Sequence, residues 1–386
     1  MNPEETPKKN GMRAIWIASA IFFIFGLGFS IYWFAYKRYY PSTDDAYVNG
    51  NMILITPQVS GIVTSILADN TQFVEEGQPL VEIDRHDYEI AFEGAKAELA
   101  DTVRKVAQLF LRVEELQARL EEREADLLRA ELDYDHRKAL VEDRSVSLED
   151  FEHSETTFLA MSAARIEAEK ALLQAKVEVE NTTLETHPKV MLAKSRFKRA
   201  FLDLHRCLVL APSSGIITQR KAQVGEKVGA TDPLMALVPL DQIWVDANYR
   251  ELNLKYLRIG QKVTLFADMY GRSLTYDGRI VGLNPGTGSI FSVLPPQNAT
   301  GNWIKIVQRV PVKISLDPEQ IKAHPLVLGL TVTVKTNTRD RSGRQLPDES
   351  LIEPIYKTRI YERELQGIEE LMEQIIAENG PRCGQN

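Results

Sequence analysis

One long uncharged run stands out near the start of the chain. Residues 14–36 carry no charged side chain and are rich in Ile, Phe and Trp. At about 1.5 Å per residue, a helix of this length crosses a bilayer core of roughly 30 Å. The pattern predicts a transmembrane helix over 14–36, a cytoplasmic tail over 1–13, and all later residues on the other side of the membrane.

A cleaved signal peptide is the alternative interpretation of this run. The run is longer than the apolar core of a typical signal peptide, and the residues from Tyr36 to Tyr40 offer no small-residue cleavage site. We therefore expect the helix to be retained. The flanking cations favour a cytoplasmic N-terminus only slightly; they are Lys8, Lys9 and Arg13 before the run, and Lys37 and Arg38 after it.

One apolar pattern occurs twice, and its two copies lie far apart. Superposing Gly61 on Gly215 aligns them without a gap, and each copy shows short apolar runs separated by turn residues. Each unit is too small to bury a face alone, so we expect the halves, 57–84 and 206–239, to pack into one lipoyl-like β-sandwich. Its predicted core includes Gly61, Val63, Leu80, Gly215, Ile217 and Leu234.

The residues between the two halves follow a heptad pattern. No proline or glycine interrupts residues 96–141, and apolar residues recur every seven positions. This is typical of a coiled coil, so we predict that 85–205 forms an α-helical hairpin. The first row is Phe92, Leu99, Val106, Val113, Leu120, Leu127, Tyr134 and Val141; the second is Tyr88, Ala95, Leu109, Leu116 and Ala130, with failures at Thr102, Arg123 and Arg137.

A second helix is expected to return antiparallel to the first, because a short turn near 142–145 joins them. Ser147, with Asp150 three residues later, predicts its N-cap. The sequence His187-Pro188 breaks or kinks it. Its apolar residues are Phe151, Phe158, Leu172 and Val179, with Leu159, Ile166 and Leu173 beside them.

Short strands punctuated by glycines follow the second half-domain, over 240–337. They predict a small β-barrel, which the stretch 43–56 would close as an edge strand. This nesting would place both chain ends near the membrane and the hairpin far from it. The predicted strands are 243–248, 262–267, 275–283, 304–315 and 331–336.

The C-terminal extension, 338–386, contains an amphipathic segment. Over 361–378, one helical face carries Leu365, Ile368, Met372 and Ile375. Interleaved glutamates argue against a membrane span, so we expect this helix to dock on the barrel or on the membrane surface. The predicted fold is therefore mixed α and β, elongated and multidomain, with a transmembrane helix, a coiled-coil hairpin inserted in a split lipoyl/biotinyl-like β-sandwich, and a β-barrel domain.

Composition and charge narrow the function classes. The hydrophobic share of 44% and the charged share of 26% are near globular averages, so most of the chain folds in water. A net charge of -8 argues against nucleic acid as a partner. Two cysteines are too few for a disulfide framework, and Cys207, in an apolar strand pattern, is interpreted as a buried small residue, whereas Cys383 lies in the polar last residues.

The chain lacks a recognisable catalytic or cofactor motif. In a lipoyl or biotinyl carrier, a modified lysine occupies the turn joining the halves, but neither Glu-Ala-Met-Lys nor Asp-Lys-Ala occurs at either inner end. The group Asp84-x-His86-Asp87 could touch a metal, although a solvated junction is the preferred interpretation. We therefore predict a protein that is not an enzyme and that carries no cofactor or metal.

Several stretches resemble the HlyD class of membrane-fusion (periplasmic adaptor) proteins and, within it, the EmrA-type multidrug efflux subunits. The resemblance covers about residues 12–336 and is weaker beyond. The matching stretches are 43–48, 58–61, 69–70, 244–248, 259–261 and 296–309, of which the last is long and specific.

This resemblance implies a tripartite pump of a Gram-negative cell. The anchor would lie in the cell inner membrane beside an EmrB-like major-facilitator transporter, with the bulk of the chain in the periplasm. The hairpin tip would dock on a TolC-like outer-membrane channel, several copies would assemble as a homo-oligomer, and the pump would export hydrophobic toxic compounds and confer antibiotic resistance.

The same resemblance points to residues at the hairpin tip. Adaptors that contact TolC-like channels often carry Arg, then Leu four residues on, then Ser seven further. That frame falls here on His136, Leu140 and Ser147, so His136 replaces the arginine, and Arg137 or Arg144 could supply the basic contact. Packing of Leu140 at the hairpin end and capping by Ser147 are the purely structural alternatives.

The sequence leaves two other functions to consider. A biotinyl or lipoyl carrier subunit would need the lysine that is missing. An adaptor of a type I protein-secretion system would work with an ABC transporter instead of a major-facilitator protein, so the inner-membrane partner distinguishes it from a drug-efflux adaptor.

Overall fold

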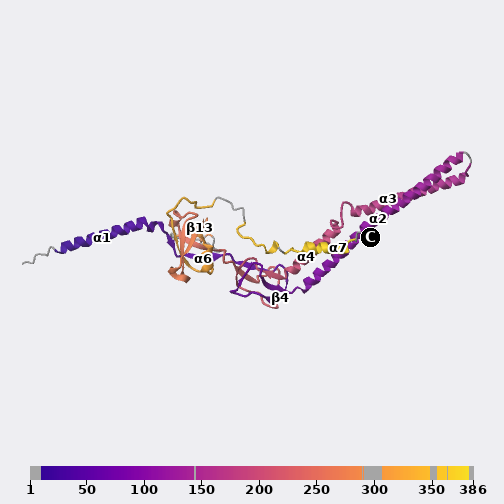
Figure 1. Cartoon of the computed structure of the whole chain (residues 1–386). Coiled ribbons are helices and arrows are strands. Elements are labelled where there is room, and N and C mark those ends of the chain that lie inside the picture. Colours follow the sequence, from indigo (N-terminus) through magenta and orange to yellow (C-terminus); the bar gives the residue numbers. More distant parts are fainter. Residues whose placement is uncertain are drawn as a thin grey trace, which may run out of the picture.

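The computed structural model describes residues 10–142, 145–288, 290, 307–347, 354–362 and 364–381. These residues form an elongated molecule in which an N-terminal helix, a β-barrel, a β-sandwich and a helical hairpin follow one another (Figure 1). In the sequence, the hairpin is inserted in the sandwich and the sandwich lies between segments of the barrel. In space, the three domains follow one another end to end.

The N-terminal helix α1, Asn10–Ala35, extends away from the rest of the protein (Figure 1). The candidate span Ile15–Tyr39 has a mean hydropathy of 2.0, none of it is buried within the molecule, and it alone among the described helices is long and apolar enough to cross a membrane. A short 3-10 helix η1, Lys37–Tyr39, connects α1 to the barrel.

Seven strands form the barrel sheet, in the order β1-β15-β12-β13-β14-β11-β2. A bridge between Tyr47 of β2 and Thr331, just before β15, closes it. Burial alternates along β11, because every second side chain of a strand points to the same face of the sheet. The strands are β1 Ser42–Thr43, β2 Ala46–Gly50, β11 Ile243–Arg250, β12 Lys262–Ala267, β13 Tyr276–Leu283, β14 Arg309–Leu316 and β15 Val332–Thr336, and the short helices are α5 Glu251–Leu254, η2 Asp268–Ser273 and α6 Pro318–Ala323.

The stretch 43–56 differs from the single barrel edge strand that the sequence predicts. It is divided between two domains, because β2 pairs with β11 in the barrel, whereas β3, Ile53–Ile55, pairs with β10 in the sandwich. The division falls at Gly50, where a Cβ atom would lie 2.8 Å from Leu328 Cδ2 and 3.2 Å from the Gln242 carbonyl oxygen. Close packing at this glycine leaves no room for a side chain where the chain passes from the barrel to the sandwich.

The two sheets of the sandwich each combine both halves of the repeat. One sheet has the order β3-β10-β8-β5 and the other β7-β6-β4-β9. Strand β4 of the first half pairs with β9 of the second, and β8 of the second pairs with β5 of the first. Neither half could form its sheet alone. The strands are β4 Gly61–Ile66, β5 Phe73–Val74, β6 Pro79–Ile83, β7 Leu208–Leu210, β8 Gly215–Thr218, β9 Lys227–Val228 and β10 Met235–Val238.

The hairpin consists of one continuous outgoing helix and a return helix in two pieces. Helix α2, His86–Glu142, packs against α3, Leu148–Val179, and then against α4, Pro188–His205. The break before Pro188 agrees with the prediction, since proline lacks the N–H that an uninterrupted helix needs. His187 caps α4 by accepting a hydrogen bond at Nδ1 from the Lys189 N–H, at 3.2 Å.

The C-terminal helix α7, Ile368–Asn379, lies against the root of the hairpin. This corrects the expectation that the helix docks on the barrel or on the membrane surface. Its apolar face enters a core shared with α2 and α4, so the root is a three-helix bundle. On its other side, α7 contacts α4 through an ion pair between Glu369 and Lys198. The residues of this core are Leu99, Val103, Val106, Val190, Ala193, Phe197, Ile368, Met372, Ile375 and Ile376.

The C-terminal segment therefore runs from the barrel past the sandwich to the hairpin (Figure 1). The Ile259 N–H donates to the Arg344 carbonyl in the barrel, the Arg359 N–H donates to Glu76 Oε1 of the sandwich, and Arg206 pairs with Glu364 at 3.1 Å. The described end of the chain consequently lies along the hairpin and far from α1, which corrects the expectation that both ends lie near the membrane.

Candidate functional site

The tip of the hairpin is held by stacked aromatic side chains. The ring of Tyr134 on α2 lies between Phe151 and Phe158 on α3, with both centroid distances at 5.5 Å. Lys138 Nζ lies 5.6 Å from the centroid of the Tyr134 ring. These rings fix the register of the two helices near their ends, so the residues beyond them are presented on a rigid support.

Two of the predicted tip residues meet at Asp150. The Ser147 hydroxyl accepts a hydrogen bond from the Asp150 N–H at 3.1 Å and donates one to the Asp150 carboxylate at 2.6 Å. Arg137 donates to the Asp150 carbonyl at 3.1 Å and to Asp133 at 3.2 Å. Ser147 thus caps α3, and Arg137 joins the two helices of the hairpin.

The other predicted tip residues have fewer contacts. His136 is exposed, and Leu140, two residues before the end of α2, is 44% exposed. Arg144 lies outside the described residues. The described part of the tip therefore presents an exposed leucine and an exposed histidine next to an arginine that is held by hydrogen bonds.

The outer face of α3 carries a second apolar row. Leu159, Ile166 and Leu173 recur every seven residues and are 59%, 49% and 54% exposed, whereas Leu172 on the inner face is buried. The sequence pattern places the three residues beside the inner row. In the structure they face away from α2, and with Ala163 and Val177 they follow the spacing of an unused coiled-coil seam. We call these five residues the outer seam.

The predicted sandwich residues gather in one place. Val63, Leu80, Ile217 and Leu234 are at most 1% exposed and share a single core cluster. The two glycines permit close approach of the strands. A Cβ atom on Gly215 would lie 2.4 Å from the Val238 carbonyl oxygen, and the same atom on Gly61 would lie 2.5 Å from Ile83 Cγ2.

The junction of sandwich and hairpin carries the group considered for metal binding. His86 Nδ1 lies 2.6 Å from Asp84 Oδ1, and this hydrogen bond raises the pKa of His86 and lowers that of Asp84. Within the described ranges, no three His, Cys, Asp or Glu side chains gather as a metal site would require. Burial raises the pKa of the nearby Cys207 thiol to about 11, so this thiol stays protonated at neutral pH.

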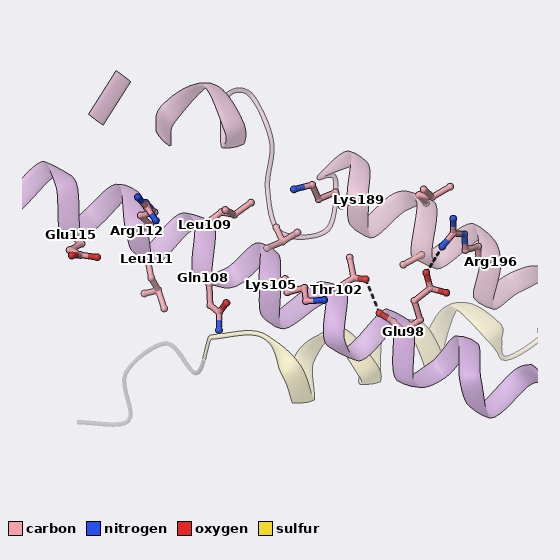
Figure 2. Close-up of a pocket in the computed structure, with 13 residues that line it drawn as sticks. Glu98, Thr102, Lys105, Gln108, Leu109, Leu111, Arg112, Glu115, Lys189 and Arg196 are labelled. Atoms are coloured by element: carbon pink, nitrogen blue, oxygen red, sulfur yellow. Dashed lines mark hydrogen bonds and ion pairs between the residues drawn. The ribbon is translucent and has the colours of Figure 1, made fainter. Parts of the chain in front are cut away.

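A groove lies on the hairpin root, between α2 and α4 (Figure 2). It has a volume of about 700 Å³. Its rim is charged: Arg196 pairs with Glu98, whose backbone carbonyl accepts a hydrogen bond from Thr102. Figure 2 shows these side chains spread over the helix surfaces. The polar groups of a catalytic site, by contrast, converge on one point in a pocket.

Comparison with known proteins identifies the family. A family model described as "EMRA, alpha-helical hairpin domain" matches residues 86–207, the hairpin itself. "Multidrug export protein EmrA" of Escherichia coli (strain K12) is 40% identical over 382 residues, which cover 98% of this chain and 97% of that protein. The chain belongs to the EmrA family of multidrug export proteins.

Other members of the EmrA family and related proteins are also similar. "Fatty acid resistance protein FarA" of Neisseria gonorrhoeae is 41% identical over 77% of this chain and 75% of its own length. Among solved structures, that of "the periplasmic adaptor protein EmrA" matches 78% of this chain and 99% of its own, with 21% identity and a TM-score of 0.39. The predicted resemblance to EmrA-type proteins is confirmed by the family model and by the relative from Escherichia coli.

Proposed function

We propose that the chain is the periplasmic adaptor of a tripartite efflux pump that exports hydrophobic toxic compounds. Helix α1 anchors it in the inner membrane beside an EmrB-like major-facilitator transporter, and the hairpin tip contacts a TolC-like outer-membrane channel. The observation that carries the proposal is the placement of an apolar helix at one end of the molecule and the hairpin tip at the other (Figure 1). An adaptor of this kind connects a transporter in one membrane to a channel in the other and catalyses no reaction itself.

The dimensions of the hairpin support this role. Helix α2 has 57 residues and, at about 1.5 Å per residue, is roughly 85 Å long. The three-helix root, the coiled-coil shaft and the aromatic stack at the tip each resist bending. A stiff rod of this length carries the tip well away from the membrane that holds α1.

A charged substitution at the exposed Leu140 tests the contact between the hairpin tip and the channel. Leu140→Asp should abolish drug resistance in a strain that depends on this adaptor, because a carboxylate in a contact surface would have to be desolvated. Leu252→Asp, at a leucine of α5 that is 80% exposed, is the matched control and should leave resistance intact. Both variants should accumulate in the membrane fraction at equal levels. Full resistance of the Leu140→Asp strain would refute the docking of the tip.

Assembly of several copies is supported by the outer seam of α3. A row of apolar side chains at heptad spacing on the outside of a coiled coil is suited to pack against another helix. A second copy of the hairpin offers such a helix, since α2 exposes Leu111 and Leu132 along its own outer face. We therefore expect hairpins to pack side by side.

A charge in the outer seam tests this assembly. Ile166→Asp should reduce the mass of the detergent-solubilised complex, measured by light scattering, toward that of one chain. Val224→Asp, at an exposed valine of the sandwich, should leave the mass unchanged. An unchanged mass for Ile166→Asp would exclude the outer seam as the contact between copies.

A further inference from the structure

The end of the barrel from which α1 emerges is strongly basic. Within a chain whose net charge is -8, the residues around this point carry a cluster of cations. Lys37 and Arg38 begin η1, one residue after the end of α1, and are exposed; the others lie in and after β15. We call this group the basic collar; it consists of Lys37, Arg38, Lys335, Arg339 and Arg341.

Backbone pairing holds the two parts of the collar together. The Thr338 N–H and hydroxyl donate to the Tyr39 carbonyl at 2.9 and 3.0 Å, and the Thr336 N–H donates to the Pro41 carbonyl at 3.1 Å. Strand β1 pairs Ser42 with Lys335. The cations near residue 340 are therefore fixed beside the end of the candidate membrane span, although about 300 residues separate them along the chain.

Tyrosine rings support the collar cations. Lys335 Nζ lies 5.7 Å from the centroid of the Tyr36 ring and 5.1 Å from that of Tyr40. The Arg341 guanidinium lies 5.8 Å from the ring of Tyr39 and 4.4 Å from the ring of Tyr256. Cation–π contacts orient these groups without neutralising them, and tyrosines at the end of a transmembrane helix typically lie at the level of the lipid head groups.

Among the residues that the structure describes, the collar cations have no carboxylate partners. Within the described part of the chain, none of its five side chains forms an ion pair. The one acidic residue in the segment, Asp340, accepts hydrogen bonds from the Ser342 N–H and hydroxyl instead. A dense, unneutralised group of cations favours an anionic partner.

We propose that the basic collar binds the phosphate groups of anionic phospholipids in the leaflet from which α1 emerges. The proposal rests on the membrane anchoring proposed above for α1 and goes beyond it, because an anchor alone leaves the barrel free to tilt. Contacts from η1 and from the segment after β15 reach the head groups on two sides of the helix end. They seat the barrel on the bilayer and direct the hairpin away from it.

Hydrogen–deuterium exchange of the full chain in lipid nanodiscs tests the proposal. The discs contain phosphatidylcholine alone or a mixture of phosphatidylcholine and phosphatidylglycerol. Amides of residues 335–344 should exchange several-fold more slowly in the anionic discs, and high salt should remove the difference, because each cation near an anionic surface strengthens binding by roughly five-fold at low salt.

Charge-reversal variants make the test specific. Arg339→Glu combined with Arg341→Glu should abolish the slower exchange in anionic discs. Lys221→Glu combined with Lys227→Glu changes the net charge equally at exposed lysines of the sandwich and should retain it. Circular dichroism of both variants should match that of the unaltered chain.

Four outcomes would overturn the proposal. Equal exchange in both kinds of disc, with the chain incorporated in each, would exclude lipid binding and leave the anchoring intact. Equal protection by soluble glycerophosphate added to neutral discs would show a site for free phosphate groups. Protection that requires an added transporter would show a protein partner. Failure of the chain to enter either disc would refute the anchoring itself.

Discussion

The pseudo-symmetry of the sandwich extends to single hydrogen bonds. The superposition of Gly61 on Gly215 also aligns Thr71 with Gly225. The Thr71 N–H donates to the Ile217 carbonyl at 2.9 Å, and the Gly225 N–H donates to the Val63 carbonyl at 2.8 Å. Both residues have positive φ, +71° and +85°. Glycine adopts this conformation freely, whereas the β-branched Thr71 is strained in it.

This difference predicts opposite effects of two substitutions. Thr71→Asn should stabilise the sandwich by about 1 kcal/mol, because asparagine tolerates the left-handed region better than threonine. Gly225→Thr should destabilise it by about 1–2 kcal/mol through the backbone alone, since no atom lies within 4 Å of the added Cβ. Denaturant unfolding followed at the sandwich measures both changes. A loss of stability in Thr71→Asn would show that the hydroxyl matters more than the strain.

The polar interruptions of the α2 heptads show how single residues are accommodated. Thr102 donates to the Glu98 carbonyl at 2.7 Å, and Arg123 lies 3.6 Å from Asp126. Arg123 and Arg137 are each 33% exposed at the side chain, so the aliphatic stems lie in the seam while the guanidinium groups reach its edge. A heptad row therefore tolerates arginine where it would not tolerate a short charged side chain.

At the scale of the element, helix α2 has the burial pattern that its heptad repeat predicts. Every residue of both predicted rows is at least half-buried, from Leu99 in the root to Tyr134 at the tip. The return helix is different, because α3 carries two apolar rows of similar spacing. Periodicity alone cannot decide which row meets α2, and only the packing shows that the Leu172 row is inside.

A buried charge tests the register of the coiled coil. Val113→Asp places a carboxylate in the seam without a partner and should cost about 2 kcal/mol of local stability. Leu111→Asp, two residues earlier and 52% exposed, should cost little. Circular dichroism and hydrogen exchange across α2 and α3 report the difference. Equal effects of the two substitutions would contradict the assigned seam.

At the scale of the whole molecule, the C-terminal segment links all three soluble domains. Its contacts with the barrel, with Glu76 of the sandwich and with the hairpin root join domains that the chain connects elsewhere only through short junctions. The segment fixes the direction of the hairpin relative to the barrel, which matters because a long rod magnifies small changes of angle at its base.

Detachment of α7 should loosen this connection. Met372→Lys buries an ammonium group in a core where Met372 is 2% exposed, and should weaken docking of α7 by about 3 kcal/mol. Exchange of amides in α4 and the root of α2 should accelerate. Glu373→Lys, at the neighbouring exposed position, is the control and should leave exchange unchanged. Unchanged exchange in Met372→Lys would show that the hairpin root is stable without α7.

Local and periodic features were determined by the sequence itself. The apolar run of α1, the heptads of α2, the repeat around Gly61 and Gly215, and the N-cap at Ser147 each depend on side chains a few residues apart, so their physical consequence can be worked out from spacing alone. The strands of the barrel follow for the same reason.

The tertiary structure decided the features that depend on contacts between distant segments. The division of 43–56 at Gly50, the docking of α7 on the hairpin, the outward direction of Leu159 and the basic collar all bring together residues that lie far apart in sequence. An amphipathic pattern predicts that one face of a helix is buried, but it does not identify the partner that buries it. The cations of the collar lie far apart in the sequence and form one surface only because the barrel strands bring them together.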